Sequence, residues 1–246
     1  MNDNADENIK KSALQKLFRS FMDCPDEIAN AQISKIVERI RAGIETVCAV
    51  SEPLDLKELM LRINDDFPGD RGVFCPLLLN ILKLSPGEGF FMGANNPHAY
   101  ISGDCVECMA LSDNVIRAAL TPKYKDVETL CSSLTYDSGK AVGILSPLAI
   151  DQYTMLYRPP LSSCAEFEVE RTSIPGGVEG YSPVHVNCGS ILLFLEGIAA
   201  LTLGDKTLNV QAGSIIYTSS GSDVKIDVKG ADSVLFYRAH VNLGDS

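Results

Sequence analysis

The period of the hydrophobic pattern changes along the chain, and this change constrains the fold most. Up to about residue 66, apolar residues recur at helical spacing, as in Ile33, Ile36, Val37, Ile40, Ile44 and Val47. From about residue 165, short β-branched and apolar runs recur with Gly, Asp or Ser between them. The pattern predicts a mainly β protein with an α-helical N-terminal segment and a C-terminal antiparallel sandwich or barrel.

Prolines mark the expected boundaries of these elements. Pro25 and Pro53 stand where new helices can begin, and a second apolar stripe follows Pro53, formed by Leu56, Leu59, Ile63 and Phe67. The sequence Tyr-Arg-Pro-Pro-Leu-Ser-Ser at 157–163 holds two prolines, which do not fit a central strand. We therefore expect a domain boundary within it.

Charge and composition exclude several classes of partner. The chain has 246 residues and a formal net charge of −11, from 32 acidic and 21 basic residues. This balance argues against a nucleic acid or an anionic membrane as the main partner. A small anionic substrate is compatible with it if a few cationic side chains converge locally.

Apolar runs and cysteines bear on the compartment. We expect no signal peptide, because charges interrupt the first twenty residues, and no membrane span, because the apolar run 190–204 is too short. The eight cysteines are irregularly spaced, which favours reduced thiols in a cytoplasmic protein. Cys105 and Cys108 would point to opposite faces of a strand, so we do not expect them to chelate a metal together.

The stretch from residue 84 to 123 holds most of the chemistry. His98 follows Asn-Pro at a rigid corner between two expected strands, which suits a metal ligand, although an isolated His is more often an ordinary side chain. Glu107 is a carboxylate in an apolar strand, available for proton transfer or simply facing solvent. Arg117 lies in the apolar run 115–120, where it either meets an anion or lies at the surface.

A resemblance to a known family favours functional roles for His98, Glu107 and Arg117. The sequence Pro-His-Ala-Tyr-Ile-Ser-Gly-Asp-Cys-Val-Glu-Cys-Met-Ala at 97–110, followed by Ser-Asp-Asn-Val-Ile-Arg-Ala and Thr-Pro-Lys-Tyr-Lys-Asp-Val, resembles the signature region of type I mannose-6-phosphate isomerases. Phe-Pro-Gly-Asp-Arg-Gly-Val at 67–73 and Leu-Leu-Asn at 78–80 also resemble that family. The resemblance covers nearly the entire chain.

This resemblance implies cupin-type antiparallel β-barrels of jelly-roll form, with the catalytic cupin incomplete. It places a helical insertion-type domain at 1–68. The C-terminal half of the catalytic cupin, with zinc and substrate residues, would span 69–157, and a C-terminal cupin-like β-barrel would span 158–246.

The activity implied is interconversion of mannose 6-phosphate and fructose 6-phosphate through a cis-enediol in the cytoplasm, supplying GDP-mannose synthesis, with one Zn²⁺ per subunit. By resemblance, His98 is a zinc ligand, Tyr100 lines the substrate cavity, and Arg117, Glu107 and Lys123 are catalytic. Arg117 would stabilise the oxyanion, and Glu107 would transfer a proton or orient its donor. We expect His98, Glu107, Arg117 and Lys123 to face one concave surface.

The sequence also departs from the family pattern. The family's zinc site takes a Gln and a His from one strand and a Glu from another, all upstream of the helical insertion, and these are not among the 246 residues. We expect neither His185 nor His240 to replace them, so the chain is expected to be truncated and inactive alone. The alternative is a non-catalytic cupin-like binding or scaffold module that uses the C-terminal barrel.

Overall fold

The structure is a computed structural model that describes residues 3–44, 55–112, 115–139 and 143–244. Its contacts divide the chain into two units. Unit 1 comprises Met1–Ser85, Ala94–Asp104 and Ser112–Val142. Unit 2 comprises Pro86–Gly93, Cys105–Leu111 and Gly143–Ser246. The chain therefore crosses between the two units more than once.

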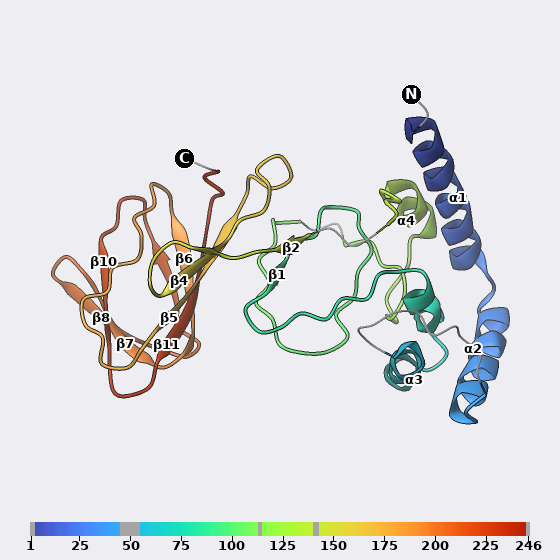
Figure 1. Cartoon of the computed structure of the whole chain (residues 1–246), viewed down its shortest axis with the longest axis horizontal. Coiled ribbons are helices and arrows are strands. Elements are labelled where there is room, and N and C mark those ends of the chain that lie inside the picture. The colour runs from blue at the N-terminus through green and yellow to red at the C-terminus, as the bar shows by residue number, and fades with distance from the viewer. Residues whose placement is uncertain (1–2, 45–54, 113–114, 140–142, 245–246) are drawn as a thin grey trace. The chain divides into compact units, whose positions relative to one another are not determined.

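Unit 1 is helical, as the periodicity predicts. Its helices are α1 (Asp3–Asp23), α2 (Asp26–Arg41), α3 (Leu56–Asp66), the 3₁₀ helix η1 (Arg71–Leu77) and α4 (Val127–Ser133), as Figure 1 shows. Two apolar clusters hold these elements together. The first, here called the α2–α3 core, is formed by Ile33, Val37, Ile40, Leu59, Met60, Ile63 and Val73. The second, the α1–α4 core, is formed by Met22, Leu130 and Cys131.

The helix boundaries differ in detail from the expected stripes. Helix α2 ends at Arg41 because Gly43 adopts a left-handed conformation with φ of +69°, a common way to end a helix. Ile44, expected in the stripe, is consequently 51% exposed. Helix α3 begins after Asp55, whose carboxylate accepts a hydrogen bond from Lys57 N at 2.8 Å. Val47 and Pro53 lie outside the described residues.

Unit 2 contains two antiparallel sheets that enclose a core, which confirms the predicted fold class (Figure 1). The six-stranded sheet has the order β3 (Leu148–Ala149), β4 (Thr154–Tyr157), β5 (Glu168–Ile174), β11 (Val234–His240), β6 (Ser190–Glu196) and β9 (Ile215–Thr218). The three-stranded sheet has the order β10 (Val224–Val228), β7 (Ile198–Leu203) and β8 (Lys206–Gln211). Hydrogen bonding does not close the described strands into one ring, so the C-terminal region is a two-sheet module. A separate pair joins β1 (Gly89–Phe90) to β2 (Ile144–Leu145).

Alternating burial explains why these strands form. In β5 and β11 every second side chain is buried, and the fully buried Phe194 and Phe236 pack with ring centroids 5.0 Å apart. The sheet begins at Leu148, ahead of the expected boundary near residue 158, because β4 pairs with β5. The expected linker is also fixed to the module: Asn242 Nδ2 donates to Pro159 O at 2.9 Å and to Cys164 O at 2.7 Å.

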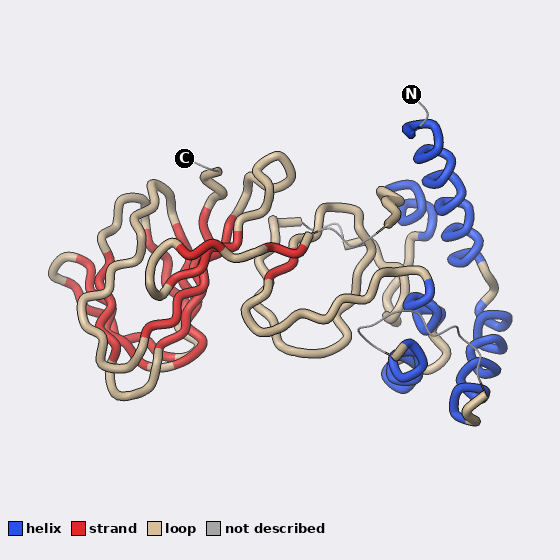
Figure 2. Tube along the Cα trace, viewed as in Figure 1, coloured by secondary structure: helices blue, strands red, loops and turns tan. Residues whose placement is uncertain are grey.

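The strands expected on either side of His98 are not present. Apart from the two-residue β1, the described residues between 86 and 126 contain neither helix nor strand, and Figure 2 shows this part as loop. The prediction that Glu107 lies on a strand was therefore wrong. Turn-forming residues are the reason: Asn95 and Gly103 have φ of +63° and +107°, and Pro97 donates no backbone hydrogen bond.

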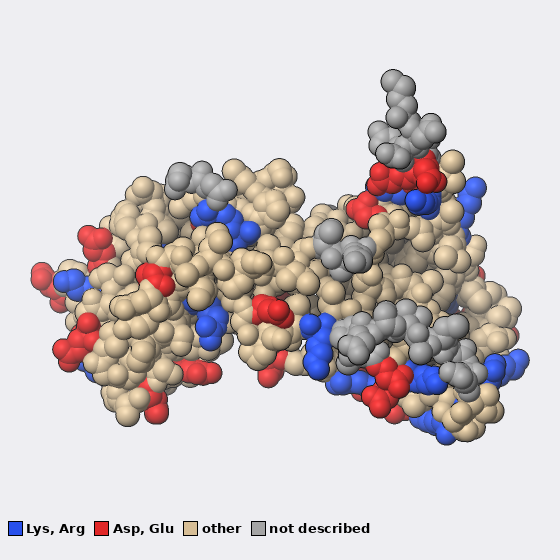
Figure 3. Space-filling view, in the orientation of Figure 1, with Lys and Arg blue, Asp and Glu red and all other residues tan. Residues whose placement is uncertain are grey.

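No helix in the described residues is long and apolar enough to cross a membrane. Lys and Arg side chains are interspersed with Asp and Glu on the face shown in Figure 3. All the described cysteines are free thiols: Cys24, Cys75, Cys105, Cys108, Cys131, Cys164 and Cys188.

Candidate functional site

His98 lies in unit 1 on a turn that is fixed by hydrogen bonds. Its Nδ1 is 2.9 Å from Asn96 O, and because a carbonyl oxygen can only accept, Nδ1 carries the proton. Nε2 is then the nitrogen with the free lone pair. Thr135 stabilises the turn, since its hydroxyl donates to Asn96 Oδ1 at 2.9 Å and its backbone N–H donates to Asn95 O at 3.3 Å. This arrangement leaves Nε2 of an exposed His98 available as a ligand or acceptor.

Tyr100 stands beside His98, with the ring centroids 6.1 Å apart. Its side chain is 61% exposed. The exposed phenol and the exposed imidazole together form an aromatic surface on unit 1.

Arg117 is half-buried, and its position is set by its two neighbours. Ile116 and Ala118 both pack against the α1–α4 core. The apolar run that contains Arg117 therefore packs on helices.

Lys123 is exposed in the turn that follows this run. Its backbone N–H donates to Thr121 Oγ1 at 3.2 Å, which closes the turn between Leu120 and Lys125. His98, Tyr100, Arg117 and Lys123 thus all belong to unit 1.

Glu107 is exposed and belongs to the segment Cys105–Leu111 of unit 2. That Glu107 faces the same concave surface as His98, Arg117 and Lys123 therefore stays a prediction.

The described residues do not complete a metal site. No group of three or more His, Cys, Asp or Glu side chains able to hold a metal ion occurs within the described ranges. A catalytic zinc ordinarily has about three protein ligands and an open position. His98 fits one of these ligands, but the donor set that the described residues offer is too small for zinc.

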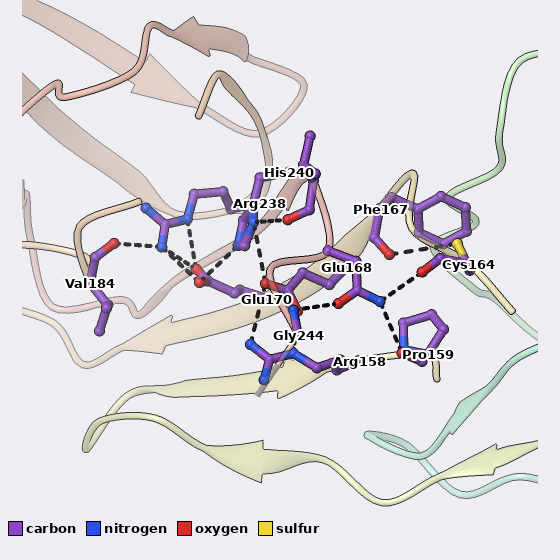
Figure 4. A network of polar contacts seen from close by, with 12 residues as sticks. Arg158, Pro159, Cys164, Phe167, Glu168, Glu170, Val184, Arg238, His240 and Gly244 are labelled. Atoms are coloured by element: carbon purple, nitrogen blue, oxygen red, sulfur yellow. Dashed lines mark hydrogen bonds and ion pairs between the residues drawn. The ribbon is translucent and has the colours of Figure 1, made fainter. Parts of the chain in front are cut away.

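A buried network of charges in unit 2 was not predicted. Glu168 and Glu170 on β5 face Arg238 and His240 on β11, because the register pairs Arg238 with Glu170 and His240 with Glu168. His240 Nε2 lies 3.2 Å from Glu170 Oε1 and its Nδ1 lies 3.5 Å from Glu168 Oε1, and Arg158 also pairs with Glu168 (Figure 4). The sequence did carry a signal for this network. Glu168 and Glu170 are two positions apart, as are Arg238 and His240, and residues at this spacing in a strand share one face of a sheet.

Comparison with known proteins finds similarity to one group of enzymes. Residues 1–79 match the family model of the phosphomannose isomerase type I helical insertion domain. Mannose-6-phosphate isomerase from Cryptococcus neoformans is 38% identical over 238 residues, which cover 94% of this chain and 52% of that protein. The human enzyme of the same name is 35% identical over 240 residues, covering 95% of this chain and 55% of that protein. Nearly the whole chain is thus similar to part of the type I phosphomannose isomerases.

A solved structure from this phosphomannose isomerase family has the same fold. The apo form of mannose 6-phosphate isomerase from Salmonella typhimurium superimposes with a TM-score of 0.73 at 26% identity, covering 95% of this chain and 55% of that one. The chain thus spans about half the length of the phosphomannose isomerases that it matches.

Proposed function

We propose that this chain provides part of the active site of a mannose-6-phosphate isomerase, which interconverts mannose 6-phosphate and fructose 6-phosphate. The observation that carries the proposal is the 38% identity, over 94% of this chain, to a relative named mannose-6-phosphate isomerase. The chain spans 52% of that relative, so the whole enzyme's activity is a proposal for this chain.

Arg117 and Lys123 bind the anionic substrate in this proposal. A guanidinium stays charged at all physiological pH values and can hold two oxygens of a phosphate or a developing oxyanion at once. The half-buried position of Arg117 supports this role, because partial removal from water strengthens its electrostatic attraction. Lys123, exposed in the next turn, adds a second positive charge to the same segment.

Glu107 moves the proton in the isomerisation. Its carboxylate removes the proton from C2 of mannose 6-phosphate as the aldehyde oxygen gains one, which gives the cis-enediol. The proton on the carboxyl group then returns to C1 while the C2 hydroxyl loses its proton, and fructose 6-phosphate results. The exposure of Glu107 supports access to a sugar. In this proposal Tyr100 lines the substrate cavity.

His98 supplies one nitrogen ligand, Nε2, to a catalytic zinc in the complete enzyme. The hydrogen bond from Nδ1 to Asn96 O supports this role, since zinc-bound histidines ordinarily donate their other ring N–H to an oxygen. We also place the enzyme in the cytoplasm, feeding GDP-mannose synthesis, and the free thiols are compatible with this compartment.

The test is an NMR titration of the purified chain with mannose 6-phosphate and, in parallel, with mannose. Without the rest of the site we expect weak binding, with a Kd on the order of 1 mM, and amide shifts near Arg117 and Lys123 only for the phosphorylated sugar. Arg117→Gln should remove these shifts, and Arg62→Gln, which changes an exposed cation on α3, should keep them. Equal shifts with both sugars, or none with either, would refute the proposal.

A further inference from the structure

The carboxylate of Asp70 joins two segments of unit 1 that lie fifty positions apart in the sequence. Its Oδ1 accepts hydrogen bonds from Gly72 N at 2.7 Å and from Leu120 N at 3.0 Å. Its Oδ2 lies 3.5 Å from Lys125 Nζ. The Asp70 side chain is only 15% exposed, so these bonds are largely protected from competition with water.

Leu120 needs an external partner to keep its backbone conformation. Its φ is +55°, in the left-handed region, which is unfavourable for a residue with a side chain. The bond from its N–H to Asp70 offsets this cost, and its side chain packs against the α2–α3 core. A conformation of this kind persists only where the surrounding structure fixes it.

Gly72 provides the space that Leu120 occupies. A Cβ atom placed on Gly72 would lie 2.3 Å from Leu120 Cδ2 and 2.6 Å from its Cγ, closer than van der Waals contact allows. Asp70 and Gly72 thus act on the same residue, one through its backbone and the other through its side chain.

The segment that these contacts fix carries Arg117 and Lys123. Ile116 and Ala118 anchor it on the α1–α4 core ahead of Leu120, and Lys125 ties it to Asp70 beyond Lys123. Arg117 is therefore held between two packed points, and Lys123 lies between two residues that both contact Asp70.

We infer that Asp70 is a positioning residue, which fixes the segment 116–125 and so the two cations that bind the sugar phosphate. The inference rests on the proposed function for the role of Arg117 and Lys123, but the anchoring itself rests on the contacts of Asp70. Fixed placement of binding groups matters because a displacement of about 1 Å can cost two orders of magnitude in rate.

The experiment compares Asp70→Ala with Asp70→Asn, which keeps an acceptor oxygen but loses the charge. Hydrogen exchange of the Leu120 amide reports the anchoring, and NMR titration with mannose 6-phosphate reports its effect on binding. We expect Asp70→Ala to speed exchange at Leu120 by about tenfold or more and to weaken binding about tenfold. Asp70→Asn should largely retain both properties, and Gly72→Ala should behave like Asp70→Ala.

Asp65→Ala is the matched control, because Asp65 is an exposed carboxylate of the same unit that pairs with Arg41 at 2.8 Å. It should leave both readouts unchanged. If Asp70→Ala exchanges its Leu120 amide and binds mannose 6-phosphate as the wild type does, the inference is overturned. Faster exchange spread evenly over all helices of unit 1 would overturn it as well. If the wild-type chain does not bind mannose 6-phosphate while Asp70→Ala still frees the Leu120 amide, the proposed function fails and the anchoring stands.

Discussion

Arg238 and Glu170 form a two-point ion pair inside the C-terminal β module. Arg238 Nε lies 2.6 Å from Glu170 Oε2 and Arg238 Nη2 lies 2.7 Å from Glu170 Oε1 (Figure 4). The two side chains are 7% and 3% exposed. Arg238 Nη2 also donates to Val184 O at 2.7 Å, so the pair joins β5 and β11 to the loop before β6.

Removing one partner of this pair should destabilise the module strongly. Arg238→Met leaves Glu170 buried with His240 as its remaining basic partner, and we expect the free energy of unfolding to fall by about 3–5 kcal/mol. Urea unfolding followed by circular dichroism measures the change. Lys206→Met, which removes an exposed cation of the same module, should change the free energy by less than about 0.5 kcal/mol. Equal stability of the two variants would contradict the prediction.

The stability of the module should also depend on pH through Glu170. Burial by itself raises the pKa of this carboxyl group, but hydrogen bonds from His240 and Arg238 outweigh burial and lower the pKa below its ordinary value of 4.5. Ionised Glu170 therefore stabilises the folded state above that value, and the stabilisation is lost as the pH falls through the folded-state pKa.

Glu170→Gln tests this dependence. The difference in unfolding free energy between the wild type and this variant should be largest at neutral pH and should shrink below about pH 4.5. A difference that stays constant from about pH 7 to about pH 3 would show that the charge of Glu170 does not contribute.

Arg71 should be critical for the helical unit. It is 9% exposed and donates to the carbonyl oxygens of Phe21 at 2.9 Å, Met22 at 2.5 Å and Cys24 at 3.1 Å, which lie where α1 ends. It also pairs with Asp26 at the start of α2. These contacts satisfy carbonyl groups that have no partner within the helix.

Arg71→Met should therefore lower the free energy of unfolding of the helical unit by about 2–4 kcal/mol, since several carbonyl groups lose their donor. Arg71→Lys should restore only part of this loss, because an ammonium cannot match the planar arrangement of the guanidinium donors. Thermal unfolding of these variants beside Arg39→Met, an exposed arginine on α2, measures the effect. Full restoration by lysine would show that charge alone matters.

The sequence predicted regular elements well where one face is buried. The helical spacing of Ile33, Val37 and Ile40 predicted α2, and the β-branched runs predicted the C-terminal sheets. The apolar run around Arg117 was ambiguous, because a short apolar run can equally be a strand or a loop that packs on helices. Only tertiary contacts with the α1–α4 core decide between these alternatives.

The charged contacts were harder to predict than the elements. The two-residue spacing of Glu168 and Glu170, repeated in Arg238 and His240, indicated a shared face, but the register that brings them together is not visible in the sequence. The contact of Asp70 with Leu120 has no local signal, since it depends on how the loop folds back onto η1.

The 246 residues by themselves should neither hold zinc tightly nor catalyse the isomerisation appreciably. His98 offers Nε2 to a metal, but a catalytic zinc needs about three protein ligands, and one imidazole on an exposed turn holds zinc only weakly. We expect the purified chain, dialysed after zinc addition, to retain far less than one zinc per chain and to show no appreciable turnover in a coupled isomerase assay. His98→Ala should then match the wild type in both measurements, because neither protein has a complete site. One tightly held zinc together with robust turnover in the wild type, both lost in His98→Ala, would mean that the chain completes its zinc site with residues not assigned to it here.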